Sequence, residues 1–255
     1  LYCEYSDEPL ISISDRQRQP LPSANWQGTV YHGLPETLFQ FQPAAGQYLA
    51  FLGRISPEKR VDDAIRVAQR AGVPLKIAAK VDPTDRQYFE AVVKPMLNGD
   101  VEFIGEIGDH EKQEFLGNAL ALLFVIDWPE PFGLAMIEAL ACGTPVIARA
   151  RGAVPEIIDH GQSGFVIETV DEAVAAAAKV SELDRQGCRA IFEQRFTAIR
   201  MGQDYVTAFQ RLCEEKQRQQ PSLSPAPAKT RNRRALGGKR LSLKPPLLGR
   251  TPAAL

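Results

Sequence analysis

Two carboxylates separated by seven residues are the feature of this 255-residue sequence best suited to chemistry. Residues 130–138 read Glu-Pro-Phe-Gly-Leu-Ala-Met-Ile-Glu, and helix-compatible residues followed by a glycine predict a helix over 132–142. The backbone N–H groups of Gly133 and Leu134 would then be free at the start of that helix. Because the helix dipole favours negative charge there, the segment predicts an anion site.

The two carboxylates lie at opposite ends of this predicted anion site. Glu130 precedes it, whereas Glu138 lies about six residues into the helix, roughly 9 Å further along at ~1.5 Å per residue. The arrangement suits a sugar at one end, a diphosphate in the middle and a ribose at the other, with each carboxylate accepting hydrogen bonds from hydroxyl groups. The alternative is a pair of solvated carboxylates on a helix face, since the spacing alone is common.

A pair of cations follows the first candidate strand, a short apolar run that ends at Gly53. The next residues read Arg54-Ile-Ser-Pro-Glu-Lys59. Ser56 is a good N-cap for a helix over 57–71, with proline at the first helical position. Arg54 and Lys59 then flank a second helix N-terminus, although solvated surface cations are the alternative interpretation.

These two motifs resemble family 4 of the retaining glycosyltransferases. That family carries a Glu-x7-Glu motif written much like residues 130–138, and here Ala-Cys-Gly-Thr-Pro-Val-Ile follows it. In the family, Gly-Arg-x4-Lys residues hold the donor diphosphate, and Arg54 and Lys59 match those positions. The resemblance implies catalytic roles for Glu130, Arg54 and Lys59. It implies donor binding by these three residues together with Gly53, Phe132, Gly133, Leu134 and Glu138.

The resemblance covers roughly residues 10–215 and implies a GT-B fold, in which two Rossmann-like domains face each other across a cleft with the donor mainly on the second. We then expect 1–43 to be a remnant of the N-terminal domain and the linker, with most of that domain missing. Residues 44–185 would form the nucleotide-sugar-binding Rossmann-like domain and 186–215 the C-terminal helices. Residues 216–255 would form a basic, disordered tail.

Strands and helices alternate between residues 44 and 185, which supports this fold without reference to any family. The candidate strands are 48–53, 75–81, 101–105, 121–126, 144–149 and 165–168. Predicted helices between most of them are 57–71, 84–97, 109–119 (with Asp109 as N-cap), 132–142 and 154–159. The near-continuous apolar strands indicate an α/β fold with a parallel sheet covered by helices on both faces. Its ligand crevice lies beyond the carboxyl ends of the strands, where Arg54 and Glu130 fall.

We expect neither a metal ion nor a cofactor other than the nucleotide-sugar donor. A metal-dependent glycosyltransferase often carries an Asp-x-Asp motif, which this sequence lacks, and its three histidines are far apart. Arg54 can bond phosphate oxygens bidentately, Lys59 acts as a point charge, and helix N-termini add partial positive charge. Metal-independent transfer is therefore expected.

The net charge of −1 conceals a division along the chain. Residues 216–255 hold ten Lys or Arg and no acidic residue, which leaves 20 basic and 31 acidic residues in 1–215, a net of about −11. The basic segment lacks interleaved aromatic residues, so we expect no specific nucleic-acid partner. No apolar run approaches the ~20 residues of a membrane span, and no signal peptide is recognised. Scattered cysteines favour free thiols and a cytoplasmic location.

Two segments outside the motifs carry further expectations. Residues 204–214 resemble the terminal helix that crosses back to the N-terminal domain in the family. Its apolar face (Tyr205, Val206, Phe209 and Leu212) would pack on its own domain or stay exposed for a partner domain. Glu156, in a Gly-Ala-Val-Pro-Glu turn, is expected to be mainly structural, with a donor-binding role as the less favoured alternative.

Two functions remain open on this sequence. The first is a retaining glycosyltransferase that moves a sugar from a nucleoside diphosphate to an unknown acceptor hydroxyl. The second is a non-catalytic nucleotide-sugar-binding fragment or subunit that needs an N-terminal partner. A dinucleotide-dependent oxidoreductase is less consistent, because no Gly-x-Gly-x-x-Gly follows any strand.

Overall fold

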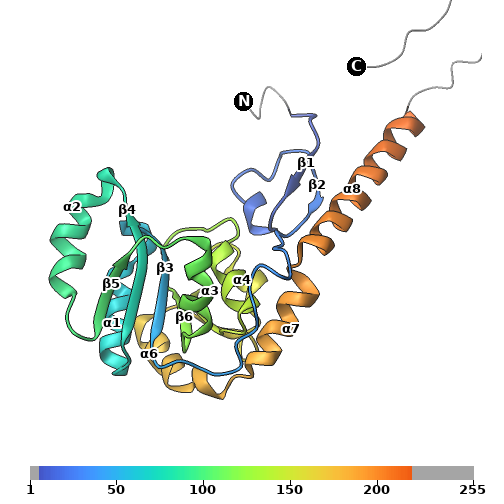
Figure 1. The fold of residues 1–255 in the computed structure, drawn as a ribbon. Helices are drawn as coiled ribbons and strands as arrows, with labels where there is room; N and C mark the ends of the chain where they lie inside the picture. Colours follow the sequence, from blue (N-terminus) through green and yellow to red (C-terminus); the bar gives the residue numbers. More distant parts are fainter. Residues whose placement is uncertain (1–5, 220–255) are drawn as a thin grey trace, which may run out of the picture.

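The fold was obtained as a computed structural model, which describes residues 6–219 (Figure 1). Its main body is a six-stranded sheet in the order β5-β4-β3-β6-β7-β8, and every neighbouring pair is parallel. The predicted Rossmann-like parallel sheet is confirmed. Its strands are β3 (Leu49–Ile55), β4 (Leu75–Val81), β5 (Val101–Gly105), β6 (Ala121–Phe124), β7 (Val146–Arg149) and β8 (Gly164–Ile167).

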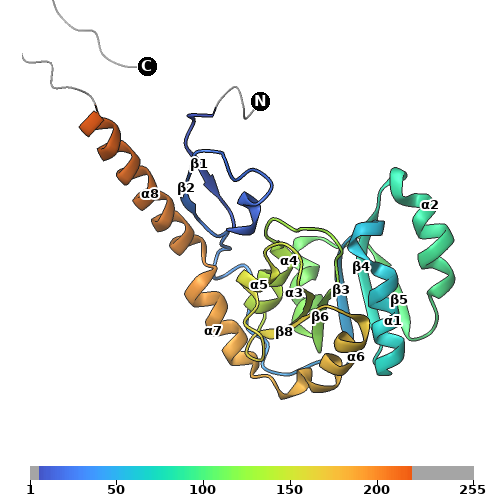
Figure 2. The same ribbon diagram turned by 180° about the vertical axis from the view of Figure 1, so that it is seen from behind.

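Helices cover both faces of this sheet, as Figures 1 and 2 show from opposite sides. One face is covered by α1 (Val61–Ala71) and α6 (Val170–Lys179), and the other by α3 (Asp109–Gly117), α4 (Leu134–Ala141), α5 (Val154–Ile157) and α7 (Arg185–Arg195). The sequence of β6 is continuously apolar because its side chains pack into the cores on both faces of the sheet. Leu122 and Phe124 pack into one core, whereas Ala121 and Leu123 pack into the core on the opposite face.

The order in which the chain adds parallel strands to the sheet reverses between β3 and β6. The chain runs outward from β3 through β4 to β5, then returns to place β6 on the other side of β3. The pairing of β3 with β6 is confined to Leu49↔Ala121 and Ala50↔Leu122, whereas β3 pairs with β4 over its whole length. The strands therefore diverge toward their carboxyl ends, which opens the crevice expected at such a switch point.

Several predicted helices begin or end elsewhere. The helix predicted over 57–71 is a 3₁₀ turn (Pro57–Lys59) followed by α1, and left-handed Arg60 (φ 54°) separates the two. Ser56 occupies the N-cap position of this turn as predicted, but its buried Oγ makes no capping hydrogen bond in the described chain. Gly108, not Asp109, is the N-cap of α3, and Glu111 accepts a hydrogen bond from its N–H. The predicted 84–97 helix is observed as consecutive helical pieces over 83–96: a 3₁₀ turn (Pro83–Asp85), α2 (Arg86–Tyr88), a π turn (Phe89–Val93) and a 3₁₀ turn (Lys94–Met96).

The two ends of the described chain lie together, apart from the main sheet (Figure 1). Strands β1 (Leu10–Ser12) and β2 (Trp26–Thr29) form a two-stranded parallel sheet beside α8 (Ala198–Gln219). Helix α8 is longer than the predicted 204–214 and includes 216–219, which were predicted to belong to the tail. The predicted disorder of 220–255 lies outside the described residues. None of the helices within 6–219 is long and apolar enough to cross a membrane.

The predicted apolar face of helix α8 is partly buried and partly exposed to solvent. Tyr205 and Leu212 are partly buried, whereas Val206 and Phe209 are 53% and 54% exposed. The helix is fastened to the N-terminal segment, because Arg200 donates hydrogen bonds to the backbone carbonyls of residues 31 and 32 at 2.6 and 3.2 Å. The face is thus partly buried and partly exposed, and its predicted choice between packing on its own domain and binding a partner domain stays open.

Candidate functional site

Two adjoining cavities open beyond the carboxyl ends of β3 and β6, where the sheet topology predicts a ligand crevice. The larger has a volume of about 430 Å³ and is lined by residues that include Lys112 and Glu138. The smaller, of about 150 Å³, is lined by residues that include Lys59 and Glu130. The two cavities share the lining residues Leu52, Gly53, Leu134 and Ala135.

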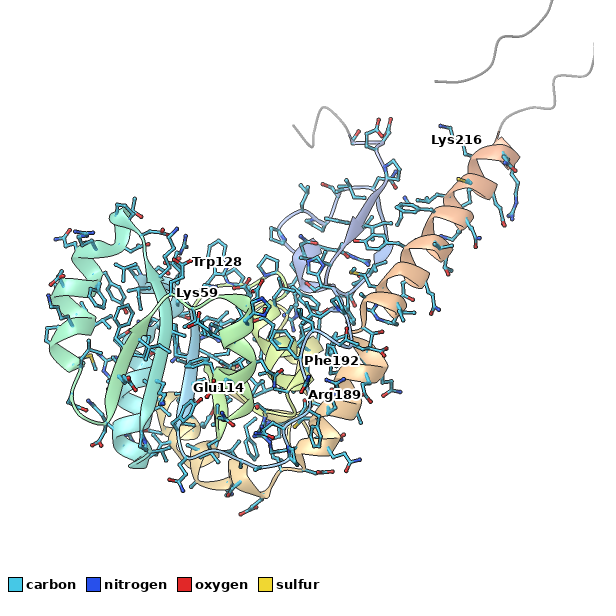
Figure 3. The ribbon with its side chains drawn as sticks, in the orientation of Figure 1. Lys59, Glu114, Trp128, Arg189, Phe192 and Lys216 are labelled. Carbon is cyan, nitrogen blue, oxygen red and sulfur yellow. The ribbon has the colours of Figure 1, made fainter. Side chains whose placement is uncertain are left out.

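Lys59 and Glu130 form the central contact of the smaller cavity. The Lys59 Nζ atom lies 2.6 Å from Glu130 Oε2, and the two side chains are 22% and 18% exposed. The ammonium also lies 5.9 Å from the ring centre of Phe124 on β6. Figure 3 labels Lys59 and Trp128 at the end of the molecule where β3 stops. The structure thus brings together two predicted catalytic residues that are 71 positions apart.

A network of largely buried ion pairs around Asp63 fixes the start of α1 and so helps to position Lys59 in the turn before it. Arg60 bonds Asp62 and Asp63 at 3.2 and 3.0 Å, which holds the left-handed residue between the 3₁₀ turn and α1. Asp63 is also bonded by Arg149 of β7 at 2.8 Å, and Arg149 donates to the carbonyl of Val125 at 3.0 Å. Burial raises the pKa of Asp63, but the bonds from Arg149 and Arg60 lower it more, so its pKa lies below the usual value.

The loop that carries Glu130 is held by close backbone contact with the loop after β7. Gly152 adopts φ 53°, and a Cβ atom built there would lie 2.1 Å from the carbonyl oxygen of Glu130. That same carbonyl accepts a 2.9 Å hydrogen bond from the N–H of Ala153. The N–H of Asp127 bonds the carbonyl of Glu58 at 2.8 Å, which ties this loop to the 3₁₀ turn of Lys59.

The predicted anion site lies at the start of α4, although this helix begins two residues later than expected. Gly133 takes a left-handed conformation (φ 90°, ψ 71°) as the N-cap, so the helix begins at Leu134 instead of Phe132. Within residues 6–219 the N–H groups of Gly133 and Leu134 have no hydrogen-bond acceptor. Both residues line the smaller cavity, so the free amides lie at the crevice as predicted.

Phe132 does not present its side chain to either cavity. It is 2% exposed and packs in an aromatic cluster, with ring-centre distances of 5.0 Å to His32 and 6.2 Å to Tyr31 and Phe196. The ring therefore lines neither cavity, and the predicted donor-binding role of Phe132 would rest on its backbone. Its structural effect is to anchor the loop before Gly133 against the N-terminal segment.

Arg54 follows Gly53 in β3, but it lines neither cavity and is not joined to the Lys59–Glu130 pair. Its guanidinium is 50% exposed and lies 2.9 Å from Glu58 and 3.8 Å from Asp82. The two predicted diphosphate-binding cations therefore have separate carboxylate partners in this structure. Gly53, one residue earlier in β3, is exposed and lines both cavities, as its predicted donor-binding role requires.

Glu138 faces the larger cavity from α4 and has a partner that sequence reasoning missed. The residue is 9% exposed, and Lys112 Nζ lies 3.0 Å from its Oε1 atom. Lys112 lies among the many charged residues of α3, and nothing in its spacing marks it. Only the packing of α3 beside α4 identifies it.

Glu156 fastens the N-terminal segment to the main body, in agreement with its predicted structural role. Its carboxylate accepts hydrogen bonds from the backbone N–H groups of Asp15 and Arg16, both at 2.8 Å, and from the Tyr31 hydroxyl at 3.2 Å. Burial, together with the negative charge of Glu156, raises the pKa of Tyr31 to about 12. The hydroxyl therefore remains a donor at neutral pH.

Residues 39–195 match the protein family described as glycosyl transferases group 1. The chain is 32% identical over 142 residues to D-inositol 3-phosphate glycosyltransferase of Mycobacterium marinum, covering 51% of this chain and 29% of that relative. It is 30% identical over 177 residues to glycogen synthase of Mycobacterium tuberculosis, covering 63% and 42%. The chain thus spans less than half the length of these curated relatives.

Solved structures establish the fold. Sucrose-phosphate synthase from Thermosynechococcus elongatus superposes with a TM-score of 0.71 at 19% identity, covering 81% of this chain and 59% of that one. Anabaena HepE in complex with UDP and glucose has a TM-score of 0.68 at 20% identity, covering 79% and 62%. The likeness confirms the predicted GT-B-like architecture.

Proposed function

We propose that this chain, which belongs to the glycosyl transferases group 1 family, is a retaining, metal-independent glycosyltransferase that moves a sugar from a nucleoside diphosphate to an acceptor hydroxyl. The observation that carries the proposal is the Lys59–Glu130 contact of 2.6 Å beside the free amides of Gly133 and Leu134. A cation, a carboxylate and a helix N-terminus converge there within one cavity. This combination matches a diphosphate joined to a polyhydroxyl sugar.

Each residue has a definite part in the proposed reaction. As the bond between the anomeric carbon and the diphosphate oxygen breaks, negative charge develops on that oxygen. Lys59 and the amides of Gly133 and Leu134 stabilise this charge, while Glu130 accepts hydrogen bonds from the sugar hydroxyls. Glu138 accepts hydrogen bonds from the ribose at the other end of the crevice.

Arg54 must change partners to join this arrangement. Its pairs with Glu58 and Asp82 are solvent-accessible, and exposed ion pairs of this kind contribute only ~0–1 kcal/mol. The guanidinium can therefore turn toward a diphosphate at little cost and bind its oxygens bidentately. This movement is part of the proposal.

A nucleotide-sugar-binding protein that does not transfer the sugar by itself is the second candidate. The residues that line the two cavities account for binding of a nucleotide sugar, and no acceptor pocket has been identified among the described residues. Its binding chemistry would be the same, and a partner domain would supply the acceptor side. HepE, which has this fold, binds UDP and UDP-glucose, so uridine nucleotides are the first probes.

Calorimetry with UDP, GDP and ADP, each with and without EDTA, tests the proposal. We expect one nucleotide to bind equally well in both conditions, and binding that disappears with the chelator would contradict metal independence. Lys59→Gln should weaken that binding, whereas Lys94→Gln, which removes an exposed lysine paired with Glu90, is the matched control. Incubation with the corresponding labelled nucleotide sugars then separates the two candidates, since hydrolysis or transfer indicates an enzyme and binding without turnover indicates a binding protein.

A further inference from the structure

Lys112 is a largely buried cation of the crevice that the proposed chemistry does not use. It lies in the first turn of α3, and its ammonium reaches across to α4, where Nζ is 3.0 Å from Glu138 Oε1. The same Nζ lies 3.2 Å from an oxygen of Asp109. The lysine side chain is 22% exposed and that of Glu138 is 11% exposed.

The buried carboxylate of Glu138 requires a cationic hydrogen-bond donor such as Lys112. Glu138 is the one polar residue in α4, whose sequence is Leu-Ala-Met-Ile-Glu-Ala-Leu-Ala. A carboxylate in such surroundings is costly unless it is paired and hydrogen-bonded. Burial lowers the pKa of Lys112, but the hydrogen bonds and charges of Glu138 and Asp109 raise it above its usual value, so the ammonium stays protonated at neutral pH.

The ion pair uses only one oxygen of the glutamate. Within the described chain Lys112 bonds Oε1, and no donor is bonded to Oε2. The terminal torsion of a glutamate side chain is soft, so an anchored Oε1 is what sets the direction of Oε2. Both side chains line the 430 Å³ cavity, together with Gly53 and Ala135.

We infer that Lys112 is the positioning residue of the ribose subsite: it holds Oε1 of Glu138 so that Oε2 accepts hydrogen bonds from the 2′- and 3′-hydroxyls of the donor. The inference rests on the proposed function and deepens it by assigning ribose selectivity to a pair of residues. A lysine that only attracted the diphosphate would act equally on nucleotides with and without those hydroxyls. The two roles therefore differ in a measurable way.

Calorimetry with UDP and 2′,3′-dideoxy-UDP tests this role. We expect the wild-type chain to prefer UDP by roughly tenfold or more, the scale of one charge-assisted hydrogen bond. Lys112→Met should remove most of that preference by weakening UDP binding, and Lys112→Arg should retain it. In a Glu138→Gln background, Lys112→Met should have no further effect on the preference. Should GDP or ADP be the nucleotide that binds, its own dideoxy form replaces that of UDP.

Lys80→Met is the matched control for charge. Lys80 lines the same cavity, but its Nζ bonds Asp82 at 3.0 Å and forms no ion pair with Glu138 among the described residues. Any loss in this variant should be equal for the two nucleotides. The inference is overturned if folded Lys112→Met keeps the preference, if it weakens both nucleotides equally, if Lys112→Arg loses the preference, or if the wild-type chain binds UDP without one. Failure of every nucleotide to bind would instead refute the proposed function.

Discussion

Lys59 and Glu130 neutralise each other's charge at 2.6 Å without exhausting their hydrogen-bonding capacity. The contact uses Oε2 of the glutamate, which leaves Oε1 for sugar hydroxyls. An ammonium carries three donors, so the lysine keeps two for diphosphate oxygens. The pair can therefore serve both halves of a nucleotide sugar while it remains intact.

The carboxylates of Glu130 and Glu138 should bind different parts of the ligand. Glu138→Ala should weaken UDP and UDP-glucose alike by ~1.5–3 kcal/mol, because both carry the ribose. Glu130→Ala should leave UDP binding unchanged or slightly stronger, since it frees Lys59, and should cost affinity only for UDP-glucose. Calorimetry on both variants with both ligands checks this, and equal losses in all four combinations would refute the assignment of the two ends.

At the scale of elements, the site depends on loops that are held by backbone contacts. Gly152 shows this most directly, because any side chain at that position would overlap the Glu130 backbone. Gly152→Ala should therefore displace the Glu130 loop and weaken UDP-glucose binding by tenfold or more, on the scale of ~1.4 kcal/mol. Binding assays with UDP-glucose measure it.

Gly72→Ala is the matched control for that substitution. Gly72 has φ 65° as the C-cap of α1, and a Cβ built there meets nothing within 4 Å. The control should lose ~1 kcal/mol of stability from left-handed backbone strain and keep its affinity for UDP-glucose. A similar loss of affinity in both variants would show that strain, not displacement of the loop, is responsible.

Protonation of Asp63, in the first turn of α1, should make the free energy of unfolding depend on pH. Its pKa in the folded chain is below the unfolded value of about 3.9, so its contribution is present above that pH and is lost as the pH falls through the folded pKa. Asp63→Asn should cost ~3–5 kcal/mol at pH 7, because Arg149 loses its buried partner. Urea unfolding at pH 7 and below pH 4 should show the difference from wild type shrinking in acid. Asp100→Asn, an exposed residue without an ion pair among the described residues, should show neither effect.

At the scale of the whole molecule, the N-terminal segment is connected to the donor crevice. Glu156 holds the backbone of residues 15 and 16, and the Ser14 hydroxyl bonds the carbonyl of Pro131 at 2.6 Å, one residue after Glu130. The aromatic cluster around Phe132 adds an apolar contact between the same parts. A displacement of the N-terminal segment should therefore also displace the loop that carries Glu130.

Hydrogen exchange can detect this connection. Glu156→Ala should speed the exchange of the amides of residues 15 and 16 and, to a smaller extent, those around Pro131. Glu182→Ala removes an exposed carboxylate from the 3₁₀ turn after α6 and should leave both regions unchanged. If the Glu156 variant affects neither region, its hydrogen bonds do not hold the segment in solution.

Local sequence pattern determined the sheet and the candidate crevice. Every predicted strand lies within two residues of its observed bounds, because strands buried on both faces must be apolar runs between turn residues. Glu130, Gly133, Leu134 and Glu138 are joined by one short loop and helix. Their placement at the crevice therefore follows from the topology of a parallel sheet.

Tertiary packing alone decided which charges meet. The partners Lys59 and Glu130 are 71 positions apart, and Lys112 reaches Glu138 only because α3 packs beside α4. The Phe132 ring is buried because the N-terminal segment supplies aromatic neighbours, and the break at Arg60 depends in part on the carboxylate of Asp63, which Arg149 holds. Periodicity reports which face of an element is apolar, whereas a side-chain contact depends on the distance between elements that are remote along the chain.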